Sequence, residues 1–355
     1  MKSLILVLML VSAASFFAVA QESKTQSKFD FVPGDQIIYY DDFSSTNVGD
    51  FPMDWNTSGS GEVVTYPAYP GHWLQLTKSG FFFPEVKDKF TDNFTVEFEF
   101  VPLLNSKSEF MYGIDFYIVS GTLDNPNEGG AIPGKAGIRI TAGYDEISWT
   151  NYSERTEGYK DKGISAFQFK PGQLYRVAIW VQKFRIRMYV DQSKVLDLPR
   201  GLIDGYTYNI FRMETIDEAI PLIGKVRIAA GLPDMRTKLL NNGKFISYGI
   251  QFDVNSATLR PESATTLKEL AQIMTDNPAL KIKIVGYTDS DGADAFNLDL
   301  SKKRANAVME ELIRNYKIDA VRLTSDGKGK AEPVAPNDNA VNKARNRRVE
   351  FVKVS

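Results

Sequence analysis

Cysteine is absent from this 355-residue sequence, and histidine occurs only once, at His72. Without cysteine the chain forms no disulfides, so its hydrophobic cores alone must stabilise it. It also lacks the thiol that carries the anchor of a lipoprotein, and the Cys and His ligands of many metal sites. The formal net charge of −2 gives no general attraction to nucleic acid. We therefore expect no cofactor, no bound metal, no nucleic-acid partner and no lipid anchor.

Long apolar runs are also absent after the first twenty residues. A basic residue, the apolar segment 4–11 and the small residues Ala18 and Ala20 predict a signal peptide over residues 1–20. The alternative is an uncleaved membrane anchor, for which the apolar segment is marginally short. The sequence therefore predicts export to the periplasm.

Residues 29–231 have the pattern of short strands separated by clusters of Gly, Pro, Asn and Asp. Segment 94–101, FTVEFEFV, places apolar side chains on one face and polar side chains on the other. Segments 175–181 and 184–190 alternate in the same way around Gln182-Lys183, which predicts a hairpin. No amphipathic helix of useful length occurs in this half. The pattern predicts an all-β antiparallel sandwich.

The pattern changes to alternating strands and helices from about residue 245. YGIQFDV (248–254), KIKIVGY and the final RRVEFVKV predict strands. One helix has Pro261 in its first turn, and a second helix starts near Asn297. Their apolar positions recur at helical spacing, at Leu267, Leu270, Ile273 and Met274, and then at Leu298, Leu300, Ala305, Val308, Met309 and Leu312. The sequence predicts an α/β domain of β-α-β-α-β order over 245–355, after a linker over 232–244.

The loop between the second strand and the second helix of this domain is rich in acids. Asp289, Asp291 and Asp294 surround Gly292, as acids surround the glycine of a calcium loop. Counted from Asp289, however, the glycine falls at position 4 instead of 6, and position 12 is Leu300 instead of glutamate. The loop also lies between a strand and a helix. The spacing therefore argues against calcium.

Asp289 and Arg304 are the alternative candidates. Asp289 follows the end of a strand, and Arg304 lies near the buried side of the next helix, so helix packing brings both to one opening. Asn297 adds an amide there, and it is a candidate cap of the first helical turn. A carboxylate and a guanidinium together suit a zwitterionic ligand. Spacing alone leaves an internal salt bridge between Asp289 and Arg304 equally open.

The motifs TD-x-x-G, N-x-x-LS-x-x-RA and NRRVE follow FDVNSATLRPES in this order. The segment resembles the OmpA-like C-terminal domain shared with peptidoglycan-associated lipoproteins and the flagellar stator protein MotB, over about residues 245–355. Members of this family bind peptidoglycan noncovalently at the amino-carboxylate centre of meso-diaminopimelate. The resemblance implies that Asp289 and Arg304 make this contact. It implies three supporting positions, Thr288, Asn297 and Arg347.

One position departs from the family pattern, because Tyr287 stands where the family often has histidine. Tyrosine keeps a ring and a polar tip, so we expect the fold to survive with an altered pocket rim. On the same resemblance, Asp291 and Asp294 are exposed acids of the loop and the helix start. Lys302 and Lys303 are expected to face solvent or glycan.

The first half resembles the concanavalin and laminin-G type of jelly-roll sandwich. The resemblance is carried by HWLQL, FTVEFEFV and YRVAIWVQKFRIRMYVDQSKVLDLP, although Gln192 replaces an expected glycine. Folds of this type often bind carbohydrate. His72, beside Trp73, is expected to be structural. Five aromatic residues are candidates for stacking on sugars, although buried packing is favoured for each of them: Trp55, Tyr66, Tyr69, Trp149 and Tyr152.

Two alternatives remain for this half. A glycan-degrading or glycan-modifying enzyme needs paired carboxylates, and segment 94–101 offers only two Glu on one face. An outer-membrane β-barrel fits the alternation, but long polar connections and short strands disfavour it. The sequence therefore predicts a non-enzymatic envelope protein that binds peptidoglycan and tethers a periplasmic sandwich or the outer membrane to the cell wall. Carbohydrate or an outer-membrane protein is the expected partner of the sandwich.

Overall fold

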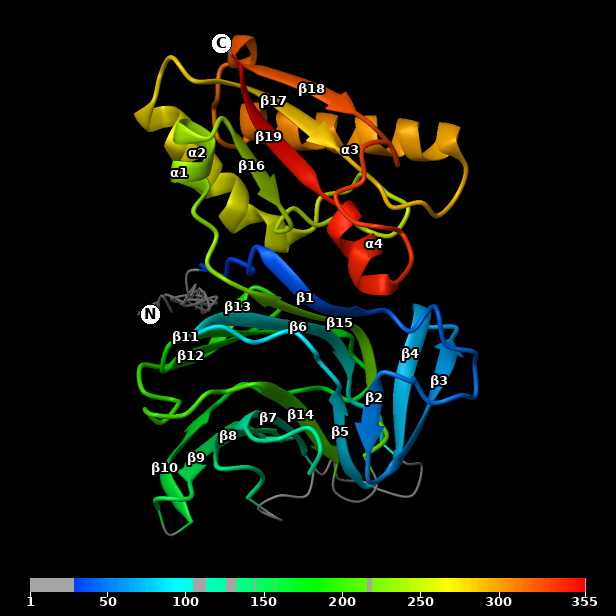
Figure 1. Ribbon diagram of the computed structural model, residues 1–355, viewed down its shortest axis with the longest axis vertical. Coiled ribbons are helices and arrows are strands. Elements are labelled where there is room, and N and C mark those ends of the chain that lie inside the picture. The colour runs from blue at the N-terminus through cyan, green and yellow to red at the C-terminus, as the bar shows by residue number, and fades with distance from the viewer. Residues whose placement is uncertain are drawn as a thin grey trace, which may run out of the picture.

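The computed structural model describes residues 29–104, 113–125, 132–143, 145–156, 158–215 and 219–354. The predicted signal peptide over residues 1–20 lies outside the described residues. Within them, no helix is both long and apolar enough to cross a membrane. The described chain forms two bodies that lie against each other, a β-sandwich below and an α/β domain above (Figure 1).

Two antiparallel sheets make up the sandwich domain. The first has the strand order β13-β12-β11-β6-β15-β4-β3, with β1 also paired to β15. Its strands are β1 (Gln36–Asp41), β3 (Ser60–Tyr66), β4 (Tyr69–Lys78), β6 (Asn93–Val101), β11 (Tyr175–Gln182), β12 (Arg185–Val190), β13 (Ser193–Leu198) and β15 (Leu222–Ala230). The second has the order β10-β9-β8-β7-β14-β5-β2. Its strands are β2 (Trp55–Thr57), β5 (Gly80–Pro84), β7 (Ile114–Ser120), β8 (Ala136–Ala142), β9 (Ile147–Ser153), β10 (Tyr159–Ser165) and β14 (Ile210–Thr215).

The sandwich core forms between the two sheets, as the alternation of segment 94–101 predicts. Phe98 and Phe100 of β6 meet Phe116 of the opposite sheet at ring-centroid distances of 4.9 and 5.6 Å. Strands β11 and β12 pair as the predicted hairpin, with the turn at Lys183-Phe184. The prediction of an antiparallel β-sandwich is therefore confirmed.

The polar face of β6 does not point into solvent. Glu99 is buried, because the C-terminal domain lies on this outer face of the first sheet (Figure 1). Gln251 of the C-terminal domain donates to Glu97 (3.1 Å), and Arg260 forms an ion pair with Glu99 (3.4 Å). The apolar face of β6 therefore lies in the sandwich core, and its polar face contacts the C-terminal domain.

The C-terminal domain has a four-stranded sheet of order β16-β19-β17-β18, in which β17 and β18 are parallel. Its strands are β16 (Lys244–Ser247), β17 (Lys281–Gly286), β18 (Leu323–Gly327) and β19 (Val349–Val354). Its helices are α1 (Met235–Asn241), α2 (Ala264–Asp276), α3 (Asp294–Arg314) and α4 (Ala340–Asn346), with short 3-10 turns η1 (Pro261–Ser263) and η2 (Ala320–Arg322). The predicted α/β architecture of this domain is confirmed.

The helical periodicity of the C-terminal domain predicts its core well. All four predicted apolar positions of α2 are buried, and so are Leu300, Ala305, Val308 and Leu312 of α3. Met309 of α3 is only partly buried, and Leu298 is 41% exposed at the start of this helix. The segment predicted as a linker, 232–244, includes α1, whose Met235 and Leu239 are buried in this core.

The predicted strand over 248–254 is wrong. The strand is β16, which ends at Ser247 and pairs with β19 so that Phe245 lies opposite Phe351. After Ser247 the chain leaves the sheet, and Phe252 makes only an isolated bridge to Leu259. The apolar residues of this segment, including the buried Ile250, line the boundary with the sandwich domain. Ile250 and Phe252 also pack into the core of the C-terminal domain, so the alternation arises from loop packing and not from a strand ladder.

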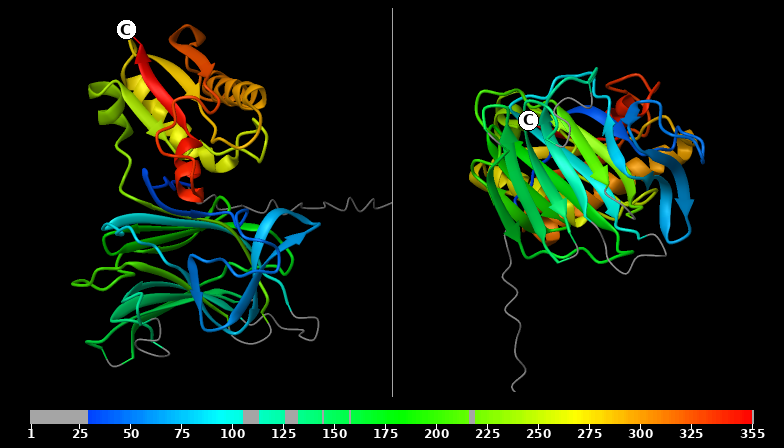
Figure 2. Two further views of the ribbon diagram at one scale, coloured as in Figure 1. Left: turned by 45° about the vertical axis from the view of Figure 1, so that its right-hand side comes forward. Right: turned by 90° about the horizontal axis from the view of Figure 1, so that it is seen from below.

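The two domains contact each other mainly along β1. The guanidinium of Arg345 in α4 donates to the carbonyl oxygen of Ile37 in β1 (2.7 and 3.0 Å). The hydroxyl of Thr265 in α2 donates to the carbonyl oxygen of Phe29 (3.3 Å). Both views in Figure 2 keep α4 beside the blue strand β1. Phe29 and strand β1, at the amino-terminal end of the sandwich domain, therefore form part of the surface on which the C-terminal domain packs.

Candidate functional site

Backbone hydrogen bonds hold the loop after β17 in place. The amide of Thr288 donates to the carbonyl oxygen of Gly329 (2.9 Å), which follows the neighbouring strand β18. The carboxylate of Asp289 accepts from the amide of Asp291 (3.1 Å) and so closes the loop on itself. Asp289 is only 8% exposed. Asp289 lies shortly after the end of the buried strand β17, as the sequence predicts.

Helix α3 approaches this loop closely because glycines leave room for it. A Cβ atom at Gly286 or Gly327 would overlap the backbone of Ser301 or Lys302 in α3. The helix begins at Asp294, three residues earlier than predicted, with Ala293 at its cap position. Asn297 therefore does not cap the helix.

Asn297 has a different role, since its buried side-chain amide donates to the carbonyl oxygen of Asp291 (2.7 Å) and fixes the loop. The exposed acids of this region pair with lysines, Asp291 with Lys343 (2.7 Å) and Asp294 with Lys330 (2.5 Å). Asp291 and Asp294 are therefore exposed acids of the loop and the helix start, as predicted.

The guanidinium of Arg304 is held by backbone oxygens. It donates to the carbonyl oxygens of Ser256 (2.9 Å) and Asp253 (3.4 Å), and its Cζ lies 5.0 Å from the ring centroid of Phe252. Among the described residues it forms no ion pair with a carboxylate. Burial and the charge of Arg347 lower the pKa of Arg304 to about 10, although Asp289 acts in the opposite direction. The guanidinium of Arg304 is thus a charged hydrogen-bond donor in a buried site, where a charge without a counter-ion is unfavourable.

The sequence left open an ion pair between Asp289 and Arg304. In the structure, Asp289 pairs with Arg347 instead. The Nη1 atom of Arg347 lies 2.6 Å from the carboxylate of Asp289, and its Cζ lies 4.7 Å from the ring centroid of Tyr40 in the sandwich domain. Burial opposes the charge, but Tyr40 and Asp289 outweigh this effect and raise the pKa of Arg347. Its Nη2 atom is buried without a hydrogen-bond partner among the described residues. This arginine therefore keeps one donor for a further group.

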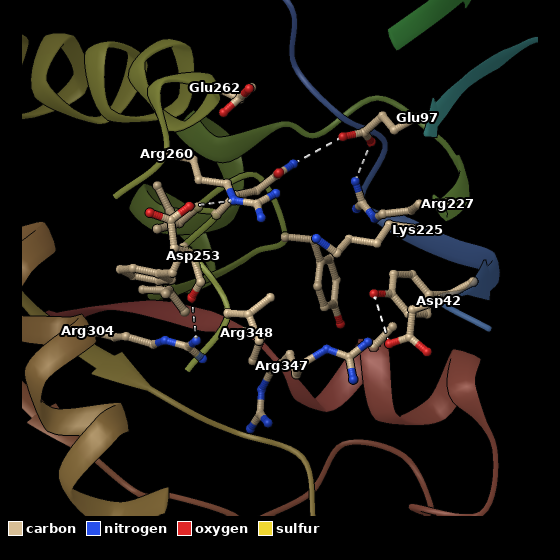
Figure 3. A pocket seen from close by; sticks show the side chains of 18 of the residues that line it. Asp42, Glu97, Lys225, Arg227, Asp253, Arg260, Glu262, Arg304, Arg347 and Arg348 are labelled. Carbon is tan, nitrogen blue, oxygen red and sulfur yellow. Dashed lines mark hydrogen bonds and ion pairs between the residues drawn. The ribbon is translucent and has the colours of Figure 1, made fainter. Parts of the chain in front are cut away.

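All five residues assigned from the sequence line one cavity of about 420 Å³ between the two domains: Thr288, Asp289, Asn297, Arg304 and Arg347. Figure 3 shows Arg304 and Arg347 on its C-terminal side, with Asp42, Glu97, Lys225 and Arg227 on the sandwich side. A cavity of this size falls within the range of ligand pockets, about 300–1,000 Å³. The sequence does not predict that the sandwich domain forms one side of this cavity, because residues such as Tyr40 are far from Asp289 in the chain.

Tyr287 lines the same cavity and packs against Arg348 and Glu350. Its hydroxyl donates to Glu350 (3.2 Å), and the guanidinium of Arg348 lies over its ring at 3.6 Å. Arg348 in turn donates to Glu350 (2.8 Å). The ring of Tyr287 is buried, so this departure from the family pattern fills a packed position beneath the loop.

The aromatic residues considered for sugar stacking are mostly packed inside the sandwich. Trp55 and Tyr152 are buried, and Tyr69 and Trp149 are partly buried. Tyr66 is the exception, at 36% exposure. The ring of His72 contacts the carbonyl oxygen of Phe43 through Nδ1 at 3.0 Å, which agrees with a structural role.

Comparison with known proteins places the C-terminal domain in a family. The model of the OmpA family matches residues 251–347. The probable lipoprotein YiaD of Escherichia coli K12 is 43% identical over 102 residues, which are 29% of this chain and 46% of that protein. Outer membrane protein A of Bordetella avium is 42% identical over 100 residues, 28% of this chain and 51% of that protein.

These two relatives each match less than a third of this chain. The chain spans about half or less of the length of these curated relatives. Among solved structures, the peptidoglycan-associated lipoprotein of Burkholderia pseudomallei is 30% identical, with 30% of this chain and 88% of that chain covered at a TM-score of 0.28. The match to the family model identifies residues 251–347 as a domain of the OmpA family.

Proposed function

We propose that the C-terminal domain binds peptidoglycan noncovalently, at the amino-carboxylate centre of meso-diaminopimelate in the stem peptide. One observation carries the proposal: the guanidinium of Arg304, which has no carboxylate partner among the described residues, lines the same cavity as the carboxylate of Asp289. The ligand's carboxylate would bind Arg304, and its ammonium would bind Asp289. The relatives with outer-membrane names support a place in the cell envelope by analogy.

The other assigned residues shape this contact. Thr288 and Asn297 hold the loop that carries Asp289, through their bonds to Gly329 and Asp291. Arg347 neutralises part of the charge of Asp289 and offers its free Nη2 to the ligand carboxylate. Two charge-assisted pairs contribute about 1.5–3 kcal/mol each, so we expect weak binding of a single stem. The wall repeats this ligand many times, and effective concentration makes a weak site an adequate tether.

This function makes the protein an anchor in the bacterial cell envelope. We place it in the periplasm, attached to the cell wall and associated with the outer membrane, with the sandwich domain as the tethered module. The jelly-roll resemblance of the sandwich suggests carbohydrate or an outer-membrane protein as its own partner. We assign no enzymatic role, because Glu97 and Glu99 are each engaged by cations, Glu97 by Arg227 (2.5 Å) and Glu99 by Lys225 (2.9 Å).

Sedimentation with purified sacculi tests the proposed site. Arg304→Ala and Asp289→Asn are each expected to remove the protein from the sacculus pellet, because each variant loses one of the two charge-assisted contacts. Arg314→Ala is the matched control, since Arg314 lies at the exposed end of the same helix and pairs only with Glu310. Thermal unfolding of each variant shows whether the fold is kept. Folded variants that still sediment like the control would disprove the assignment.

A further inference from the structure

The cavity at the peptidoglycan site has a second wall, and this wall belongs to the sandwich domain. Strands β1, β6, β11 and β15 contribute to it, and its cations include Arg176 and Lys225. Arg304 lies on the opposite wall (Figure 3), and Asp289 lines the cavity from the same C-terminal domain. A ligand larger than one amino-carboxylate centre would therefore contact both domains.

The backbone directs Lys225 into this cavity by an irregularity of β15. Gly224 pairs with Glu99 and Arg227 with Glu97, so β15 has one residue more than β6 in this interval, which is a β-bulge. Lys225 lies in the bulge with φ at +47°, a left-handed conformation that is uncommon for a residue with a side chain. Strained backbone of this kind concentrates at binding sites, and bulges redirect side chains toward them.

The cations of this wall have unused donors. The ammonium of Lys225 donates to Glu99 (2.9 Å), its one hydrogen bond among the described residues, and an ammonium has three donors. Arg176 pairs with Glu262 of the C-terminal domain (3.3 Å), while its Nε atom is buried without a hydrogen-bond partner in the described part of the chain. Glu99 is shared by three cations, since Arg176 (3.9 Å) and Arg260 (3.4 Å) also face it. One carboxylate cannot satisfy all of these donors.

We infer that Lys225 and Arg176 form a second anion subsite, which binds a free carboxylate of the stem peptide beyond the diaminopimelate centre. This inference rests on the proposed function of the opposite wall. In a stem with glutamate linked through its side chain to diaminopimelate, the α-carboxylate of the glutamate stays free one residue away. The sandwich domain thus takes part in ligand selection and favours stems with this carboxylate over stems in which it is amidated.

Calorimetry on the full chain with three ligands tests this subsite. The ligands are free meso-diaminopimelate, the tripeptide L-alanyl-γ-D-glutamyl-meso-diaminopimelate, and the same tripeptide with the glutamate α-carboxylate amidated. The wild type is expected to bind the acidic tripeptide about tenfold more tightly than the other two, because one charged contact is added. Lys225→Met is expected to remove this preference and leave the affinity for free diaminopimelate unchanged.

Lys170→Met is the matched control, because Lys170 is an exposed lysine of the sandwich domain outside the cavity lining. If Lys225→Met keeps the preference while Arg304→Ala abolishes all binding, the second subsite is refuted and the peptidoglycan site stands. Tighter binding by Lys225→Met would show that the sandwich obstructs the ligand, which also refutes the subsite. If the folded wild type binds none of the three ligands, the proposed function fails and the subsite with it.

Discussion

At the scale of single residues, Arg347 connects the site to the rest of the molecule. It pairs with Asp289 at 2.6 Å and lies against Tyr40 of the sandwich domain at 4.7 Å. A cation over an aromatic ring is stabilised where water is excluded. The ring of Tyr40 therefore holds the guanidinium in the orientation that pairs with Asp289, and Tyr40 acts as a positioning residue.

Asp41, next to Tyr40, gives a prediction about the pH dependence of stability. Its carboxylate accepts from the amide of Phe43 (2.7 Å) and from Trp55 Nε1 (3.2 Å). Burial raises the pKa of Asp41 from 3.8 to about 6. Because the folded pKa lies above the unfolded value, the folded state binds the proton first, and this group stabilises the fold increasingly as the pH falls from about 6 to about 4.

We expect the unfolding free energy of the wild type to rise relative to that of Asp41→Asn on going from pH 7 to pH 4. The expected relative change is on the order of 3 kcal/mol, because one pKa unit corresponds to about 1.4 kcal/mol. Urea unfolding of both proteins across this range measures it. A constant difference between the two proteins at every pH would contradict a raised pKa at Asp41.

At the scale of elements, glycines set how closely α3 approaches the sheet. Gly286 and Gly327 end the parallel strands β17 and β18, directly beneath Ser301 and Lys302 of the helix. The position of Asn297 and Arg304 relative to Asp289 therefore depends on the absence of two Cβ atoms.

Gly327→Ala is expected to push α3 away from the sheet. The added methyl group would overlap the backbone of Lys302, and overpacking of this kind costs about 1–3 kcal/mol of unfolding free energy. We also expect weaker sedimentation with sacculi, because Arg304 moves with the helix. Gly121→Ala is the control, since its Cβ would make only ordinary contacts. Equal stability of the two variants would show that α3 adjusts without cost.

The elements also show which local signals can be read from sequence. Helix α2 was predictable, because its buried residues recur at helical spacing over 13 residues. Helices α1 and α4 have 7 residues each, which is too short for a periodic pattern, and the sequence did not predict them. The segment 248–254 misled because Ile250 and Phe252 pack into the core of the C-terminal domain from a loop, and this gives the same alternation as a strand.

At the scale of the whole molecule, charged residues join the two domains around the cavity. Arg260 of the C-terminal domain pairs with Glu99, and Arg345 donates to the carbonyl oxygen of Ile37. Glu99 and Ile37 both belong to the sandwich domain. These two contacts therefore contribute to the relative placement of the two walls.

We expect the double variant Arg260→Gln, Arg345→Gln to separate the domains in solution. Loss of these contacts leaves Glu99 with two cations and frees β1 from α4, so the radius of gyration measured by X-ray scattering should increase. Arg236→Gln is the control, since Arg236 pairs with Asp276 inside the C-terminal domain. An unchanged radius of gyration in the double variant would show that the remaining contacts, such as the ion pair of Arg176 with Glu262, are enough to hold the domains together.

The sequence by itself determined the two architectures and the family of the C-terminal domain. These conclusions rest on local features: the alternation of the strands, the periodicity of the helices and the motifs around Asp289, Arg304 and Arg347. Local features involve residues that are close in the chain, so they can be recognised in the sequence. Only the tertiary structure decided that Asp289 pairs with Arg347 instead of Arg304, because that pair joins residues 58 positions apart. It also decided that the sandwich domain closes the other side of the site. That wall depends on a bulge and on docking between domains, and neither leaves a periodic signal in the chain.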